Sequence, residues 1–486
     1  MKRTQLVTLM GLLLVAMLLA TPVLAAAPDA DPNPGTGSAD VTVMNIDAGT
    51  ASVTAEYYNQ DGTLAKTRPL NLNGMGSAQL KASESGLPEN WKGSMILSST
   101  TEVASIATIH WIGNPVGDGI EADSYEGFTT GSTRMNAPFA VYAPNAQYTV
   151  LAVQNTEGVA ATITMKYYNR EGVLDRTISD SIPANGQKTY DLHTPGDKIP
   201  VWSSIPFFQT YNHWTGAVVI ETGAANQKVA AVANNFWPTH SVAYNASSSG
   251  ATKLFIPSVE RRQILPTILG FSQIIVQNLG GSPTDLTFKF VNKDTQNVDQ
   301  TISVLNVAAG AAIGCNTRIG SNCSASQVQA LGDSWVGSVV VESSSQQVTA
   351  ISYSVRPRDA QAGGTTAASL SNAGNSVYLP EVYRVGVDPN WTVWSLLRLQ
   401  NVTANSASVE VRFINRDGTE VAAARQNITI PGEKSSNFNL RWDAPLAVLG
   451  SNWSGGVYII SGQPLAAVVE NLWVLNEMAA YNGYAK

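Results

Sequence analysis

Charged residues are scarce in this chain of 486 residues, where they make up 13% of the sequence. The 29 Lys and Arg residues are outnumbered by 36 Asp and Glu residues, which gives a net charge of −7. Proteins that bind DNA or RNA rely on an excess of basic side chains to neutralise phosphates, and this chain lacks that excess. The composition therefore argues against a nucleic acid as a partner.

Histidine is also rare, and its four residues do not share one position of any recurring pattern. A catalytic serine needs a histidine base, and no Gly-x-Ser-x-Gly sequence accompanies these histidines. The acidic residues that do recur lie beside Asn and Gly in short turns, where turn chemistry explains them without a reaction. We therefore expect no enzyme, no catalytic residue, no cofactor and no metal site.

Only two cysteines are present, Cys315 and Cys323, in a short loop rich in Gly, Ser and Asn. Their separation of eight residues suits a local disulfide, which an oxidising compartment maintains. Two thiols without a nearby histidine are too few ligands for a structural zinc site. We predict a disulfide between the two cysteines, with free thiols as the alternative.

Long apolar runs are missing except near the N-terminus, where two basic residues precede about 15 apolar residues. This run is shorter than the roughly 20 residues that span a bilayer, and small residues follow it at the spacing of a cleavage site. We predict a signal peptide over residues 1–25, cut after Ala25 or Ala27, and a flexible Pro- and Gly-rich linker over 26–38. The mature chain is then expected to lack an integral membrane segment and to be secreted, extracellular or held at the cell surface.

One spacing occurs four times along the chain: an Asn ends a short apolar segment, and a second Asn follows 14 residues later. The pairs are Asn45 and Asn59, Asn155 and Asn169, Asn278 and Asn292, and Asn401 and Asn415. Between the two Asn residues apolar and polar side chains alternate, which is typical of a half-buried strand. The Asn, Asp and Gly residues that follow predict a tight hairpin.

The second half of each unit opens with Trp-x-Gly and continues with two apolar runs, which predict a buried hairpin. The recurring tryptophans are Trp91, Trp214, Trp335 and Trp453. Because a ligand site seldom recurs unchanged in every unit whereas a core position does, we assign them a structural role. An apolar segment ending at Pro144, Pro257 or Pro380 precedes the later units, and we expect an edge strand there, since proline cannot donate to a central ladder. The first unit has no such element upstream of Val41.

These patterns predict an all-β fold of four tandem immunoglobulin-like antiparallel β-sandwich repeats, after the signal peptide and a short disordered linker. The expected repeats cover residues 39–128, 139–247, 253–360 and 377–486. Stretches rich in Gly, Ser and Ala, at 247–252 and 361–376, are expected to be linkers. Length differences concentrate between the two halves of each unit, so loops there differ from copy to copy.

The run of Val-Gln-Asn155, Tyr-Tyr-Asn169 and the later Val-Val-Ile strand resembles repeat modules of long, mostly uncharacterised exported proteins of bacteria. The resemblance covers nearly the whole mature chain. It implies a surface location and a β-sandwich fold, and it carries no activity or named site.

Three tryptophans outside the recurring positions are candidate ligand-contact aromatics. Trp391 and Trp394 lie in an irregular segment after Asp388, and Trp202 lies in the long insert of the second unit. Flat aromatic rings stack on the apolar faces of sugars, and variable loops on a repeated scaffold are common places for partner contacts.

Repetition without a catalytic constellation favours a structural or adhesive cell-surface protein, in which four sandwiches form a rod that displays variable loops. The expected partner is a cell-surface polymer, a polysaccharide or another protein. One alternative is a secreted carbohydrate-binding protein that uses surface aromatics. Another is a filament or surface-layer subunit, which would self-associate through the sheet edge left open before Val41, with a strand donated from the Tyr481 end of another molecule.

Overall fold

The computed structural model describes residues 35–112, 120–193, 213–264, 267–357, 361–474 and 477–486. The predicted signal peptide, most of the predicted linker after it, and Trp202 lie outside these ranges. Within them the helices are short, and the paired strands are antiparallel. The predicted all-β fold with several antiparallel sheets is confirmed. None of the helices in the described residues is long and apolar enough to cross a membrane.

The strands fall into four successive groups, which we call the first to fourth sections. The first section holds β1 (Thr36–Asn45), β2 (Ala51–Asn59), β3 (Leu64–Leu72), β4 (Ser77–Leu80), η1 (Ala82–Glu84), β5 (Gly93–Ser99), β6 (Val103–Ile112) and β7 (Ile120–Glu126). The second holds β8 (Arg134–Ala143), β9 (Gln147–Asn155), β10 (Ala161–Asn169), β11 (Leu174–Ile182), β12 (Gln187–Asp191), β13 (Trp214–Thr222), β14 (Val229–Phe236) and β15 (Ser241–Asn245).

The third and fourth sections follow the same order of strands. The third holds β16 (Lys253–Ile264), β17 (Thr267–Asn278), β18 (Thr284–Asn292), β19 (Val298–Val307), β20 (Ala312–Asn316), β21 (Gly320–Ser321), α2 (Ala325–Gln329), β22 (Ser334–Ser343), β23 (Val348–Arg356) and β24 (Gln361–Thr366). The fourth holds η3 (Leu370–Asn372), β25 (Gly374–Val387), β26 (Asn390–Asn401), β27 (Ala407–Asn415), η4 (Ala422–Ala424), β28 (Gln426–Ile430), β29 (Ser435–Asn439), η5 (Ala444–Leu449), β30 (Asn452–Trp473), β31 (Glu477–Asn482) and β32 (Tyr484–Ala485). Because β24 lies within 361–376, that stretch is not the linker that we expected.

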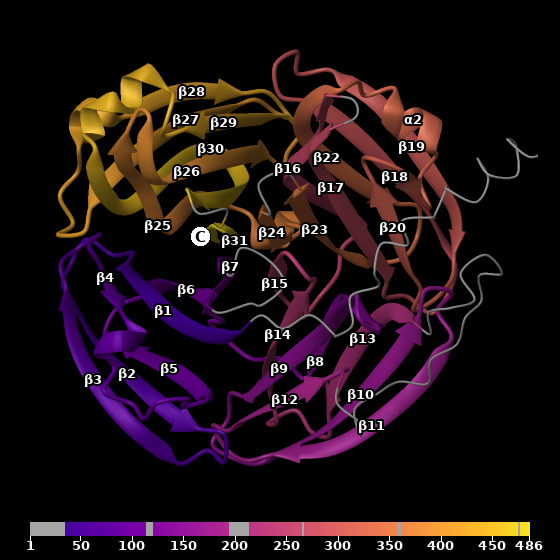
Figure 1. The fold of residues 1–486 in the computed structure, drawn as a ribbon, viewed down its shortest axis with the longest axis horizontal. Helices are drawn as coiled ribbons and strands as arrows, with labels where there is room; N and C mark the ends of the chain where they lie inside the picture. The colour runs from indigo at the N-terminus through magenta and orange to yellow at the C-terminus, as the bar shows by residue number, and fades with distance from the viewer. Residues whose placement is uncertain (1–34, 113–119, 194–212, 265–266, 358–360, 475–476) are drawn as a thin grey trace, which may run out of the picture.

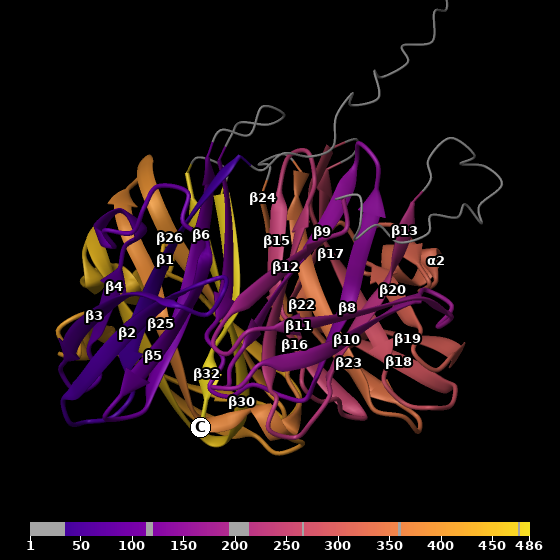
Figure 2. The ribbon, with the colours of Figure 1, turned by 90° about the horizontal axis from the view of Figure 1, so that it is seen from below.

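The four sections form a closed ring, in which the indigo first section lies beside the yellow fourth section (Figure 1). The last strands of the sections, β7, β15, β24 and β31, meet at the centre of the ring. A side view shows the strands running obliquely between the two end faces (Figure 2). The extended rod that we expected is therefore wrong. The Tyr481 end pairs inside this ring, since β31 pairs with β30, so it is not free for donation to another molecule.

Contacts between sections repeat around the ring, because each section places a hairpin tip against a loop of the next. At the junction of the first and second sections, Gln187 N donates a hydrogen bond to Gln60 O at 3.2 Å. At the junction of the fourth and first sections, Ser77 N donates to Arg416 O at 2.9 Å. The ring therefore closes through the same backbone contact that joins successive sections.

The glycines of the hairpin tips allow this close approach. Gly62 and Gly172 both have a φ of +84°, and a Cβ on them would lie 2.1 Å from Ala184 O and 2.3 Å from Ala309 O of the next section. The third section lacks a glycine at its tip. There Gln296 takes a positive φ, and its Nε2 donates to a backbone oxygen of the fourth section.

The prolines of the later sections lie in strands that join two halves of a sheet, which we call the bridging strands: β8, β16 and β25. β8, for example, pairs with β13 on one side and β9 on the other. The register shifts around Pro257 in β16 and Pro380 in β25, so each proline lies at a bend where no ladder hydrogen bond is lost. The edge strands that we expected are therefore wrong, because these strands are paired on both sides. In the described first section no bridging strand is present, and its strands form two separate sheets.

The first Asn of each recurring pair is fully buried and bonded through both ends of its carboxamide. Asn155 Nδ2 donates to Val159 O at 2.7 Å and to Pro183 O at 2.9 Å, and its Oδ1 accepts from Glu157 N at 3.0 Å. The same contacts, with residues two, four and 28 to 30 positions further on, are made by Asn45, Asn278 and Asn401. Each carboxamide thereby shapes the loop that receives the neighbouring hairpin tip.

The recurring tryptophans orient that hairpin from inside each section. Trp91 Nε1 donates to Oδ1 of Asn59 at 2.8 Å. Trp453 makes the same bond to Asn415, whereas Trp214 and Trp335 donate to Asp175 and Asp299. Each indole also meets a Tyr or Phe ring edge-on, at 5.8–6.0 Å between centroids. Each section has its own buried cluster around these residues.

The junctions differ in one side chain, the residue after the proline bend of each bridging strand. Phe139 stacks on Tyr353, Ser258 donates to Glu470, and Glu381 accepts from Thr42 and Thr108. The three junctions are thus aromatic, ionic and hydroxyl-lined.

Replacing Gly62 by Ala is expected to lower the free energy of unfolding by more than about 1 kcal/mol, because the new Cβ meets a left-handed φ and the carbonyl of Ala184. Urea unfolding measures this. Gly158→Ala is the matched control, since a Cβ there has nothing within 4 Å. Equal stability of the two variants would contradict the hairpin-tip contact.

Candidate functional site

A cluster of tryptophan and arginine side chains lies at one end of the fourth section. Arg384 is on β25, and Trp391 and Trp394 are on β26, beyond the turn that joins these strands. Arg441 and Trp442 lie between β29 and η5. The β25–β26 hairpin and this connecting segment bring together residues about 50 positions apart in sequence. We call these five residues the Trp–Arg cluster.

Arg441 is the centre of the Trp–Arg cluster. Its guanidinium carbon lies 4.3 Å from the ring centroid of Trp442, 4.5 Å from that of Trp394 and 5.6 Å from that of Trp391. Arg384 lies over the Trp391 ring at 5.1 Å. Cations over aromatic faces are attracted by the ring quadrupole, so these contacts hold the cluster together.

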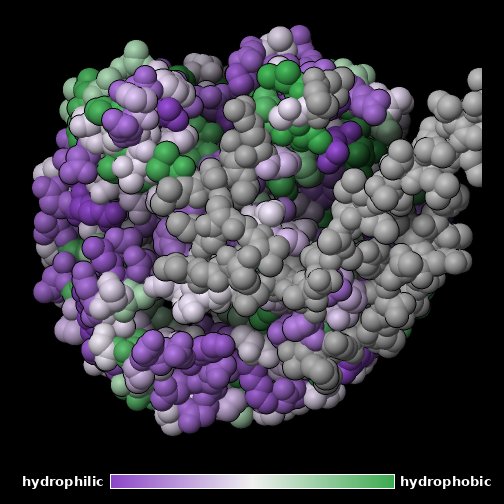
Figure 3. Space-filling model, in the orientation of Figure 1, coloured by the Kyte–Doolittle hydropathy of each residue, from purple (hydrophilic) through white to green (hydrophobic). Residues whose placement is uncertain are grey.

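The exposed ring of the cluster is not one of those that we singled out from the sequence. Trp391 is 5% exposed and Trp394 is half-buried, whereas Trp442 is 59% exposed. Trp442 could have been found, because it lies outside the recurring tryptophan positions and in the part of the unit whose length varies. Apolar patches also interrupt the polar surface over the third and fourth sections on the face seen in Figure 3.

Several donors of the Trp–Arg cluster have no protein acceptor. Trp391 Nε1 and Arg441 Nε are buried and make no hydrogen bond within the described residues. Arg384 Nη1 donates to Gly450 O at 2.5 Å, and burial lowers the pKa of its guanidinium. Arg441 Nη2 lies 3.8 Å from Asp388, a carboxylate that is largely exposed. The cluster thus combines an open aromatic face with cationic donors, and this combination suits a ligand with apolar faces and oxygen acceptors.

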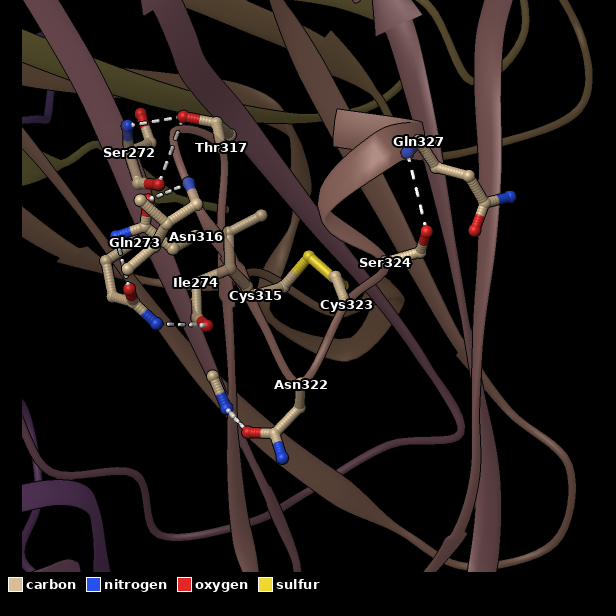
Figure 4. Close-up of a disulfide and its surroundings, with 12 residues drawn as sticks. Ser272, Gln273, Ile274, Cys315, Asn316, Thr317, Asn322, Cys323, Ser324 and Gln327 are labelled. Carbon is tan, nitrogen blue, oxygen red and sulfur yellow. Dashed lines mark hydrogen bonds between the residues drawn. A yellow bond between two sulfur atoms is a disulfide. The ribbon is translucent and has the colours of Figure 1, made fainter. Parts of the chain in front are cut away.

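The two cysteines form the predicted disulfide, which is confirmed (Figure 4). Their Cα atoms are 5.0 Å apart, and both side chains belong to the core of the third section. Asn322 Oδ1 accepts from Gly314 N at 3.0 Å, and Ser324 caps α2 just after the second cysteine. The disulfide therefore anchors the loop that leads into α2.

The described histidines are engaged in packing. His110 Nδ1 lies 3.0 Å from Glu477, and its ring meets that of Trp473 edge-on. His240 stacks on Trp237 at 4.8 Å. Among the described residues, no group of three His, Cys, Asp or Glu side chains is placed to hold a metal ion.

Comparisons with known proteins assign no family. No family model matches the chain, and no curated protein matches it. Among solved structures, Thermotoga maritima 1070 is 18% identical over 24% of this chain and 97% of its own, with a TM-score of 0.20. The Anabaena sensory rhodopsin transducer is 17% identical over 20% of this chain and 93% of its own, with a TM-score of 0.16. Both scores are below 0.5, so neither likeness supports an argument about fold or function.

Replacing both cysteines by serine is expected to lower the free energy of unfolding by about 2–3 kcal/mol, the loop-entropy value for a bridge across eight or nine residues. Chemical denaturation of the oxidised protein and the double variant measures the difference. The oxidised protein in excess reductant is the control and should lose a similar amount. An unchanged midpoint in both would contradict a stabilising role of the bridge.

Proposed function

We propose that this chain is an exported, non-enzymatic adhesion protein that binds a polysaccharide through its Trp–Arg cluster. The observation that carries the proposal is Trp442, an exposed indole with Arg441 packed beside it at 4.3 Å. An indole face excludes water from the apolar C–H face of a sugar ring, and guanidinium groups donate to sugar hydroxyls or carboxylates.

The surroundings of Trp442 favour a preformed platform. Arg441 also lies over Trp394, so the cation is held between two rings. A side chain that is already fixed loses little conformational entropy on binding. The unpartnered Nε1 of Trp391 and Nε of Arg441 give the cluster donors that a sugar oxygen would satisfy.

The proposed location rests on the N-terminal sequence and on the disulfide. The first 25 residues have the charge and hydrophobicity of a signal peptide, and a disulfide persists in oxidising compartments. The ring of four β-sandwich-like sections serves as a rigid support for loops at its outer corners.

A Trp442→Ala variant is expected to lose at least tenfold in affinity for the polysaccharide, because stacking on a sugar ring contributes most of the contact area. The mature protein is first screened on a broad glycan array, and the affinity for the best ligand is then measured by calorimetry. Leu305→Ala, which removes an exposed apolar side chain on β19 of the third section, is the matched control and should bind normally. No binding across the array, or full affinity in the Trp442 variant, would refute the proposal.

An Arg441→Gln variant is expected to lose more affinity for uronate-containing polysaccharides than for neutral ones, since only the former offer a carboxylate to the guanidinium. Calorimetry with one polysaccharide of each kind measures the two ratios. An equal loss for both kinds would show that Arg441 only positions Trp442.

A further inference from the structure

The first section has an open strand position beside β5. In the other three sections the counterpart of β5 pairs on two sides, with β13, for example, between β10 and β8. Among the described residues, β5 pairs with β2 alone. A sheet edge of this kind presents unpaired N–H and C=O groups that accept a further strand.

Side chains around the open position are less covered than their counterparts. Met95 and Leu97 of β5 are only partly buried, whereas Val218 and Ile220 of β13 are fully buried. Trp91 is half-buried, unlike the other three recurring tryptophans. Apolar surface is therefore available for a strand that packs there.

A tyrosine hydroxyl also lacks the partner that its counterparts have. Tyr244 Oη bonds both the N and the O of Phe139, at the bend of β8, and Tyr481 Oη does the same at Glu381 of β25. Tyr125 has the corresponding place on β7, opposite Ala107 of β6. Its hydroxyl makes no hydrogen bond within the described part of the chain.

A second unsatisfied group faces the same position from the second section. The residue after each proline bend contacts one site on the next section: Tyr353, Glu470 or Thr108. The corresponding site on the second section is Asn234, because it has the same place along β14. Its Oδ1 is buried and has no hydrogen-bond partner among the described residues.

The chain itself carries a matching segment just before β1. Adding 110 to each residue number places Asn45 on Asn155, and it also places four residues of the N-terminal segment on identical residues of β8 and its turn. The identities are Ala27 with Ala137, Pro28 with Pro138, Ala30 with Ala140, and Pro34 with Pro144. Gly35, with a φ of +81°, then corresponds to Asn145, with a φ of +60°, in the turn that leads from β8 into β9.

We propose that residues 25–34 of the same molecule form the missing bridging strand beside β5. The segment takes the place of the flexible linker expected there, and most of it remains after cleavage of the predicted signal peptide. Because β8 pairs Ala137 with Val218, the same register places Ala27 opposite Met95. It also places Asp31 opposite Lys92, a cross-strand pair of opposite charges.

The occupant is the chain's own segment rather than a second copy, because the turn at Gly35 has the geometry of the turn that returns β8 onto β9. Asp29 then lies after the proline bend, where Glu381 lies in the fourth section. Its backbone meets the Tyr125 hydroxyl, and its carboxylate meets the carboxamide of Asn234.

The register predicts that an Ala27→Cys, Met95→Cys variant of the mature protein forms an intramolecular disulfide under mild oxidation. Peptide mass spectrometry of the monomer detects it. The matched control is Ala27→Cys, Ile96→Cys, whose side chains point to opposite faces and should give at least tenfold less cross-link. An intermolecular cross-link would identify a second copy as the occupant, and no cross-link would leave an external strand; either result overturns the proposal.

A Tyr125→Phe variant provides a test that does not depend on cysteine chemistry. It is expected to lower the midpoint of thermal unfolding in the mature chain and to have no effect in a chain that starts at Gly35, because only the former supplies the partner of the hydroxyl. Equal effects in the two chains would overturn the proposal.

Discussion

The ring depends on four buried carboxamides, those of Asn45, Asn155, Asn278 and Asn401. Each one satisfies backbone groups of two loops that would otherwise be buried without partners, and an unpaired buried amide or carbonyl costs about 1–3 kcal/mol. An apolar side chain of similar size could fill the space but could not bond these groups. The carboxamide thus couples the end of one strand to a loop about 30 residues further on, and so fixes the shape of that loop.

That loop is also where the next section begins. The carbonyl of Ala184, one residue after the Asn155 acceptor Pro183, faces Gly62 of the first section's hairpin tip. Tip and loop can approach closely because glycine at a positive φ has no Cβ to separate the two backbones. The recurring Asn and the recurring Gly therefore act on the same junction from its two sides, and four such junctions bring the first section back against the fourth.

The recurring spacing predicted the strands, the hairpins, the structural tryptophans and the disulfide, because these depend on periodicity and on residues close in sequence. The ring was not predictable in this way, since its junctions are made largely by backbone atoms and by single side chains hundreds of positions apart. The prolines misled because their missing donor suits a bend inside a central strand as well as an edge. In the candidate site the sequence drew attention to Trp391 and Trp394, but exposure depends on the Arg441 segment, which folds over them from elsewhere.

Variation at the junctions gives the ring a defined order. Glu470 is buried beside Arg356 at 2.8 Å, and the arginines around it lower its pKa to about 2 in spite of the burial, which by itself would raise it. A buried ion pair adds little net stability over an apolar contact, but separating its members leaves an uncompensated charge. The aromatic Phe139 bend could not satisfy Glu470 and Arg356, and the Glu381 bend would place a second carboxylate beside Glu470. Each section is thereby matched to its own neighbour, so a chain of four similar sections closes in one arrangement although its hairpin contacts alone would allow others.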